Sequence, residues 1–182
     1  MIKKLSASLI ATLLISGCGI EIPEGYRPSE SAVPNASITE IAIDQRSEPI
    51  EISGPGLNGG EITTEDMSGI VIVNAWASWC PPCREEWPIF VEIQNQFPEV
   101  NLLGLNEADD INAAKDFLST QEGNWLHISD PNQAIAAKAD VVQGSYLPGT
   151  IILDKQHRVA AKFVGPVNQA DLTRILDQLV AE

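Results

Sequence analysis

Short apolar runs alternate along the chain with segments in which apolar residues recur every three or four positions. Runs bounded by turn residues are typical of buried strands, and the three- to four-residue spacing is typical of helices with one buried face. The clearest case is the run Ile70–Trp76, followed by a helical pattern over Arg84–Phe97 and a second run at Val100–Leu105. Strand, helix and strand in this order predict a parallel unit within an α/β fold.

Weaker patterns extend this unit on both sides. Further strands are expected at 38–43, 50–52, 61–63, 125–128, 150–153 and 159–164. Further helices or helical turns are expected at 64–67, 111–120, 132–139 and 169–180. The glycine-rich segment 54–60 predicts that two of the early strands form a hairpin ahead of the main sheet.

The first residues have the layout of a bacterial export signal. Two lysines precede the apolar run Leu5–Ile15, which is too short to span a bilayer as a stable helix. The run ends in Ile15–Ser16–Gly17–Cys18, which resembles the bacterial lipobox, whose cysteine receives a diacylglyceryl group and becomes the mature N-terminus. We therefore expect a lipoprotein signal peptide at 1–17 and a lipid anchor on Cys18 at the extracytoplasmic face of the cell membrane.

The remaining sequence predicts a linker and one domain. Residues 18–36 contain several prolines and no sustained period, which predicts a flexible linker, and 37–182 is long enough for a single domain with its own core. The chain has a net charge of −14, and cleavage after Gly17 would remove two lysines and no acid. Such acidity argues against binding of nucleic acid or of anionic headgroups, which leaves the lipid as the tether.

Two cysteines lie one helical turn apart in Trp79–Cys80–Pro81–Pro82–Cys83, at the junction of the buried strand and the following helix. Free backbone N–H groups and the helix dipole stabilise an anion at a helix start, so that more of Cys80 is thiolate at neutral pH. We predict that Cys80 attacks substrates and that Cys83, further in and less exposed, resolves the mixed disulfide. The dithiol is itself the redox group, so no cofactor is expected.

Two other uses of this cysteine pair are weaker. A zinc site needs four ligands, and the other candidates are only Cys18, His127 and His157, with no second CxxC. A purely structural disulfide across so short a loop would restrict the unfolded chain only a little. We therefore expect no bound metal.

The surrounding sequence extends the pattern beyond the two cysteines. The segment Asn74–Pro88, NAWASWCPPCREEWP, resembles the signature of the TlpA/ResA-like thiol-disulfide oxidoreductases, a membrane-tethered group with the thioredoxin fold, and Leu147–Asp154 resembles their cis-proline segment. The resemblance covers roughly 37–180. It implies a central mixed sheet flanked by helices, an N-terminal β-hairpin and a strand–helix insertion between Leu105 and Pro148.

The same resemblance implies that the Leu147–Pro148 bond is cis and that this loop offers backbone groups to an extended substrate polypeptide. Without it, a trans proline would be the better expectation. Gly149 stands where the family usually has threonine, which predicts a looser backbone beside the site. The expected substrate-binding residues flank the dithiol: Trp79, Pro81, Pro82, Leu147 and Pro148.

Proton transfer needs a base near Cys83. Thioredoxin has a buried aspartate six residues before its first cysteine, but this position is Asn74 here, and an amide cannot accept a proton. Glu86 follows Cys83 by one turn, and the TlpA/ResA-like group has glutamate at the matching position. We predict that Glu86 accepts the proton, with a raised pKa if it lies beneath the dithiol; the alternative is a solvated acid like Glu85.

The resemblance implies an enzyme that exchanges disulfides with protein substrates. The tethered members are mostly reductants, several of them serving cytochrome c maturation, and they need electrons from a membrane partner. The same dithiol with a higher potential would instead oxidise exported proteins, and the sequence leaves this open. Two other functions are disfavoured. Peroxiredoxins have proline and threonine at fixed positions before their cysteine, and neither residue stands at those positions before Cys80. Copper-delivery proteins use CxxxC with a distant histidine, whereas this chain has CxxC.

Overall fold

A six-stranded mixed sheet forms the centre of the protein. The structure is a computed structural model that describes residues 36–142 and 146–182. The strands lie in the order β1 (Ser37–Glu40), β8 (Val159–Val164), β7 (Gly149–Leu153), β4 (Val71–Trp76), β5 (Asn101–Glu107) and β6 (Leu126–Asp130). Strands β4, β5 and β6 are parallel, and β7, β8 and β1 are each antiparallel to their neighbours. This confirms the predicted parallel unit and the mixed sheet.

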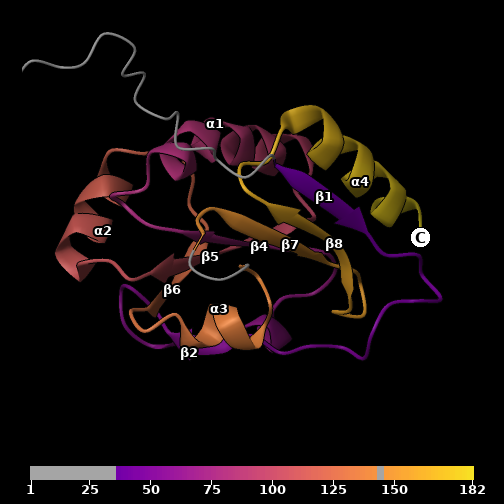
Figure 1. Ribbon diagram of the computed structural model, residues 1–182, viewed down its shortest axis with the longest axis horizontal. Coiled ribbons are helices and arrows are strands. Elements are labelled where there is room, and N and C mark those ends of the chain that lie inside the picture. Colours follow the sequence, from indigo (N-terminus) through magenta and orange to yellow (C-terminus); the bar gives the residue numbers. More distant parts are fainter. Residues whose placement is uncertain (1–35, 143–145) are drawn as a thin grey trace, which may run out of the picture. The chain divides into compact units, whose positions relative to one another are not determined.

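Helices cover both faces of this sheet. In Figure 1, α1 (Pro81–Gln96) and α4 (Gln169–Ala181) lie on one face and the short α3 (Ala134–Lys138) lies on the other, while α2 (Ile111–Ser119) follows β5. The expected additional strand and helix between Leu105 and Pro148 are present, because β6, between α2 and α3, extends the sheet beyond β5.

Alternation along β4 divides its side chains between the two faces. Ile72 packs in a cluster with residues of α1 and α4, whereas Val71 and Val73 pack in a second cluster on the α3 side. Because successive side chains of a strand point to opposite faces, Asn74 lies on the same face as Ile72, toward α1. A strand buried on both faces reads as a continuous apolar run, which is why this one was predictable.

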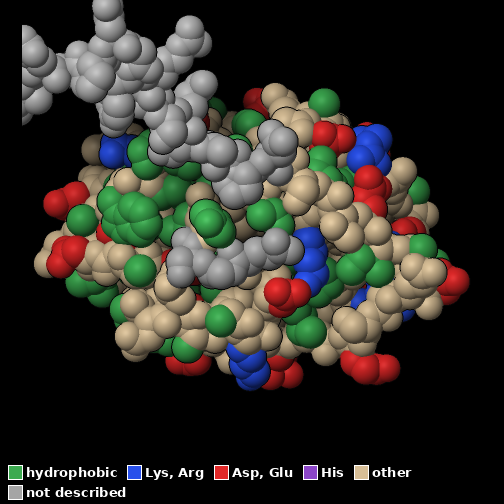
Figure 2. Space-filling view, in the orientation of Figure 1, with side chains coloured by type: hydrophobic (Ala, Val, Ile, Leu, Met, Phe, Trp, Pro, Cys, Tyr) green, Lys and Arg blue, Asp and Glu red, His purple; other side chains and the backbone are tan. Residues whose placement is uncertain are grey.

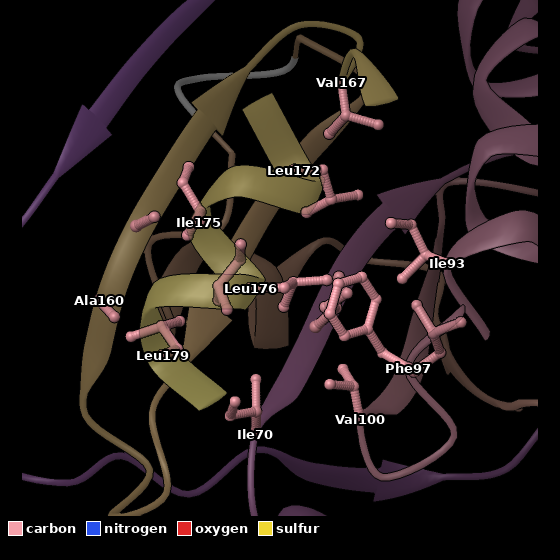
Figure 3. Close-up of a cluster of buried hydrophobic side chains, with 14 of the residues drawn as sticks. Ile70, Ile93, Phe97, Val100, Ala160, Val167, Leu172, Ile175, Leu176 and Leu179 are labelled. Atoms are coloured by element: carbon pink, nitrogen blue, oxygen red, sulfur yellow. The ribbon is translucent and has the colours of Figure 1, made fainter. Parts of the chain in front are cut away.

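The larger core cluster lies between the sheet and the two long helices. Figure 3 shows side chains of α4, among them Leu172 and Leu176, meeting Ile93 and Phe97 of the α1 segment above the strands. The predicted buried face of α1 is confirmed, since Phe90, Ile93 and Phe97 are all buried. This packing fixes α1 on the sheet and so fixes the position of its N-terminus.

The early hairpin is present but differs in its bounds from the prediction. It consists of β2 (Ser53–Pro55) and β3 (Glu61–Thr63), which form a separate two-stranded sheet. The expected strand at 50–52 is wrong, because the N–H groups of these residues bond elsewhere: that of Ile50 donates to the carbonyl of His157, and that of Ile52 to Thr64 Oγ1. Ile52 is nevertheless buried, so its apolar character reflects packing and not strand pairing.

The signal peptide at 1–17, the lipidation of Cys18 and the linker at 18–36, except for its last residue, fall outside the described residues and stay predictions. In the part of the chain that the structure describes, no helix has both the length and the apolar character needed to cross a membrane.

Candidate active site

The two cysteines form a disulfide at the junction of β4 and α1. The Cα atoms of Cys80 and Cys83 are 5.4 Å apart and their sulfurs are bonded. Cys80 is the N-cap of α1, and Pro81 and Pro82 occupy its first two positions, where missing N–H groups leave no helical hydrogen bond unmade. The helix therefore begins at Pro81, three residues before the predicted start. The expected placement of Cys80 at a helix start is confirmed.

The expected difference in exposure between the two cysteines is absent. Cys80 and Cys83 are each 2% exposed. Cys80 Sγ turns inward over the first turn of α1, where it bonds to the partner sulfur and accepts the backbone N–H of Cys83 at 3.3 Å. In the disulfide form both sulfurs are thus covered, and the predicted ordering by depth is wrong for this state.

Aromatic side chains pack beside the disulfide. Trp76, Trp87 and Phe117 belong to the same buried cluster as the two cysteines, and the Trp76 and Trp87 ring centroids are 5.3 Å apart. The Trp76 indole N–H donates to His127 Nδ1 at 3.2 Å, and burial lowers the pKa of His127 to about 4, so this imidazole is neutral. Trp76 is a core residue, as predicted.

The cis-proline segment packs against the same cluster. The Leu147–Pro148 bond is cis, as the resemblance implied, and Leu147 packs against the cluster that contains both cysteines. The looser backbone expected at Gly149 is wrong. Gly149 is paired with Ala75 in the sheet, and a Cβ there would lie 2.4 Å from the carbonyl oxygen of Val141, so the absent side chain allows close packing.

Glu86 lies on the buried face of α1, one turn after Cys83. Its side chain is buried, and its two oxygens accept from Asn74 Nδ2 and from the backbone N–H of Val167, each at 2.9 Å. The Asn74 amide also donates to Thr150 Oγ1 at 3.0 Å. Asn74 therefore reaches Glu86 from the strand face that points toward α1. The alternative of a solvated acid is excluded.

Burial decides the protonation of Glu86. Desolvation raises its pKa to about 8, against the opposing effects of the Val167 N–H and the Asn74 amide, which both lower it. A carboxyl group with this pKa is mostly neutral at pH 7 and is close in acidity to a thiol, whose ordinary pKa is about 8.5. Such matching allows a proton to move between the two groups in either direction.

The expected substrate-binding residues around the dithiol differ in exposure. Trp79 is 58% exposed, Pro81 is exposed and Pro82 is half-buried. The Trp79 indole N–H donates to the carbonyl of Ala108 at 3.0 Å, so the ring is tied to the loop after β5. On the face seen in Figure 2, hydrophobic side chains gather in the region between α1 and α2. This surface adjoins the start of α1.

The prediction from the sequence missed the loop after β5. Asp109 accepts hydrogen bonds from the backbone N–H and the hydroxyl of Ser78, two residues before Cys80. A signal was available, because β4 and β5 were predicted as parallel strands, and the carboxyl ends of parallel strands meet at one edge of a sheet. Polar residues directly after either strand were therefore candidates for contact with the cysteine segment.

The described residues contain no cluster of side chains suited to bind a metal ion. Within 36–142 and 146–182, no three or more His, Cys, Asp or Glu side chains are grouped so that they could hold a metal ion. Of the histidines considered as zinc ligands, His127 accepts the Trp76 indole N–H, and His157 lies in the turn between β7 and β8.

Comparison with known proteins relates this geometry to a family. The model of the AhpC/TSA family matches residues 47–162. The thiol:disulfide interchange protein DsbE homolog of Paracoccus denitrificans is 32% identical over 84% of this chain and 81% of its own length. The thiol-disulfide oxidoreductase ResA of Bacillus cereus is 26% identical over 68% of this chain and 71% of its own length.

A solved structure agrees with these relatives. The secreted thiol-disulfide isomerase from Corynebacterium glutamicum superposes with a TM-score of 0.75 at 31% identity, covering 86% of this chain and 97% of that one. The names of all three similar proteins refer to thiol–disulfide chemistry.

Proposed function

This chain belongs to the AhpC/TSA family and is a thioredoxin-fold thiol-disulfide oxidoreductase, and on that premise we propose that Cys80 and Cys83 exchange disulfides with protein substrates outside the cytoplasm. The observation that carries the proposal is the Cys80–Cys83 disulfide at the N-terminus of α1, with the buried carboxyl group of Glu86 one turn further along the helix. The group that reacts is the dithiol itself, and the reaction needs no soluble cofactor.

The proposed reaction has two exchange steps. In the reduced enzyme, the Cys80 thiolate attacks a substrate disulfide, forms a mixed disulfide and releases one substrate thiolate. Cys83 then loses its proton and attacks Cys80 Sγ, which closes the Cys80–Cys83 disulfide and releases the second substrate sulfur. The enzyme dithiol gives two electrons to the substrate, whose two sulfurs leave as thiolates and take up protons from the solvent; Cys80 has ionised before its attack, and the proton of Cys83 passes to a nearby base.

Glu86 is proposed to handle the proton of Cys83. When the mixed disulfide is resolved, ionised Glu86 accepts this proton. When a donor reopens the disulfide, Cys83 is the leaving sulfur and neutral Glu86 returns the proton to it. The raised pKa of about 8 supports both directions, because neither the carboxyl group nor the thiol is then a much stronger acid than the other.

The side chains around the dithiol are proposed to bind the substrate polypeptide. Trp79, Pro81 and Pro82 adjoin the two cysteines in the chain, Leu147 packs against the cluster that contains both cysteines, and Pro148 directly precedes β7. Trp79 is exposed and apolar, as a residue that meets a partner chain should be.

The proposed direction is reduction, as in the tethered group that the sequence resembles. A reductase of this kind takes electrons from a thiol reductase in the membrane and keeps cysteines of exported proteins reduced, including those to which haem is attached in cytochrome c. Lipidation of Cys18 would hold the enzyme at the extracytoplasmic face of the cell membrane beside such a donor, and a relative described as secreted supports the compartment. An oxidase of exported proteins is the alternative direction.

Two assays separate this function from peroxide reduction, which the absence of proline and threonine at the peroxiredoxin positions disfavours. The full chain carrying Cys18→Ser is reduced and mixed either with a disulfide-bonded protein or with hydrogen peroxide. We expect the protein disulfide to oxidise the reduced enzyme at least about a hundredfold faster than it oxidises an unstructured thiol. The reason is that the helix start stabilises the thiolate of Cys80 in the enzyme. Rapid oxidation by peroxide alone would contradict the proposal.

A further inference from the structure

We propose that Asp109 is a positioning residue for the reaction, which holds the turn before Cys80 so that the attacking sulfur stays at the N-terminus of α1. The inference rests on the proposed function, because it concerns how the same dithiol is presented. Its basis is a set of hydrogen bonds between two segments that are far apart in the sequence, the turn at 77–80 and residues 106–109, which comprise the end of β5 and the start of the loop after it.

The segment before Cys80 is a tight turn. The backbone N–H of Cys80 donates to the carbonyl of Ala77 at 3.1 Å, which makes Ser78 and Trp79 its two central residues. Both central residues are tied to the loop after β5. The Ser78 N–H donates to Asp109 Oδ2 at 2.6 Å and its hydroxyl donates to Asp109 Oδ1 at 2.8 Å.

The second tie comes from the residue before Asp109. The Trp79 indole N–H donates to the carbonyl of Ala108 at 3.0 Å. Ala108 has φ of 45°, in the left-handed region that non-glycine residues rarely adopt. Backbone strain of this kind persists only where the surroundings hold it, and it is found preferentially at functional sites.

Asp109 is itself fixed from the sheet. Asn106 Nδ2 donates to Asp109 Oδ2 at 2.9 Å, and Asn106 pairs with Trp76 in the register of β4 and β5. The two loops therefore leave the sheet side by side from matched strand positions. The carboxylate connects the rigid end of β5 to the turn that leads into Cys80, and hydrogen bonds to an ionised acceptor are stronger than neutral ones.

Position and charge predict opposite effects of Asp109 on Cys80. A carboxylate near the nucleophile disfavours the thiolate, so an effect of charge alone would make Cys80 ionise more readily when Asp109 is neutralised. If Asp109 instead acts by position, its removal loosens the turn, moves Cys80 Sγ away from the N–H groups of α1 and makes the thiolate less favourable. The direction in which Cys80 ionisation changes when Asp109 is replaced therefore distinguishes an effect of charge from an effect of position.

The test compares Asp109→Ala with Asp109→Asn in the full chain carrying Cys18→Ser. The reduced protein is alkylated with iodoacetamide across a range of pH, and modification of Cys80 is followed by mass spectrometry and normalised to the folded fraction. We expect Asp109→Ala to lower the Cys80 rate at pH 7 about tenfold and to raise the pH midpoint of the reaction, since the turn loses its charged acceptor. Asp109→Asn should stay within about threefold of the parent rate, because its amide oxygen accepts the Ser78 N–H and its NH₂ group donates to the Ser78 hydroxyl.

Two further variants keep the result interpretable. Asp116→Ala, an exposed acid on α2, removes the same charge and the same atoms elsewhere and should match the parent chain. Ser78→Ala removes only the hydroxyl bond and should lower the rate about two- to threefold even if Asp109→Ala folds poorly. An unchanged or faster Cys80 in both Asp109→Ala and Ser78→Ala would overturn the inference. A parent chain whose Cys80 is no more reactive than an unstructured cysteine would instead overturn the proposed function.

Discussion

Replacing Cys83 with serine should turn the enzyme into a trap for its substrates. The variant keeps Cys80 at the N-terminus of α1, so it still attacks substrate disulfides, but it lacks the thiol that releases the product. Mixed disulfides through Cys80 should therefore accumulate. Cys80→Ser, which removes the nucleophile, should lower the rate of exchange by at least about 10³-fold, the scale found when catalytic nucleophiles are removed.

Non-reducing electrophoresis and mass spectrometry of the trapped species would measure both effects. All variants carry Cys18→Ser, and the matched control is the Cys80→Ser, Cys83→Ser double variant, which then has no cysteine left and should form no adducts while retaining the same fold. If Cys83 in the Cys80→Ser variant forms adducts as fast as Cys80 does in Cys83→Ser, the assignment of Cys80 as the attacking thiol is contradicted.

Replacing Glu86 with glutamine should slow resolution of the mixed disulfide about 10²-fold at pH 7, which is the contribution typical of a general acid or base. The amide keeps the shape of the carboxyl group, and rotation of the Asn74 amide lets both pairs of polar groups stay bonded, but it can neither accept nor return a proton. Stopped-flow fluorescence of the resolution step measures the loss. Alkylation of Cys80 should stay within about twofold of the parent, because Glu86 does not act on that thiol.

The same substitution should change how stability depends on pH. The pKa of Glu86 is about 8 in the folded chain and near 4.5 when unfolded, so its contribution is complete below about pH 4.5 and is lost as pH rises through about 8. Urea unfolding should show the free energy of unfolding of the parent chain falling relative to that of Glu86→Gln over this window, by on the order of 3 to 5 kcal/mol.

The parent chain has to be compared with Glu86→Gln because a second buried acid, Glu107, also makes stability depend on pH. Burial raises its pKa to about 7, so it lowers stability over the same pH range in both proteins and cancels in their difference. Glu85→Gln, next to Glu86 but exposed, is the matched control and should change neither the resolution rate nor the pH dependence. Parallel stability curves for the parent and Glu86→Gln would show that Glu86 is ionised in the folded protein, and an unchanged resolution rate would remove its role.

The parts of the fold that the sequence predicted best are those fixed by local patterns. The strand before Cys80 is buried on both faces and so is apolar at every position except Asn74, and α1 repeats its buried residues at helical spacing. The weak early strands were less predictable. Ile50 and Ile52 are apolar because they pack in or against the core cluster on the α3 side, although their N–H groups donate to the carbonyl of His157 and to Thr64 Oγ1.

The candidate site divides in the same way. The cysteines, the cis-proline segment and Glu86 stand in recognisable motifs, so their residues could be named in advance. The equal burial of the two cysteines follows from the closed disulfide, which is a state and not a sequence pattern. The contact of Asp109 with Ser78 depends on the register of β4 against β5, which a single sequence does not specify.

We propose that Cys80 and Cys83 form a reversible redox pair that reduces its substrates. The most direct measurement is an equilibrium titration of the full chain carrying Cys18→Ser in dithiothreitol or glutathione buffers, followed by tryptophan fluorescence, since Trp76 and Trp87 pack with the two cysteines. We predict one reversible two-electron transition, with a potential below the roughly −220 to −260 mV of a glutathione pool. The absence of a reversible transition would show that Cys80 and Cys83 are not a redox pair, and a potential near −120 mV would show that the protein oxidises its substrates.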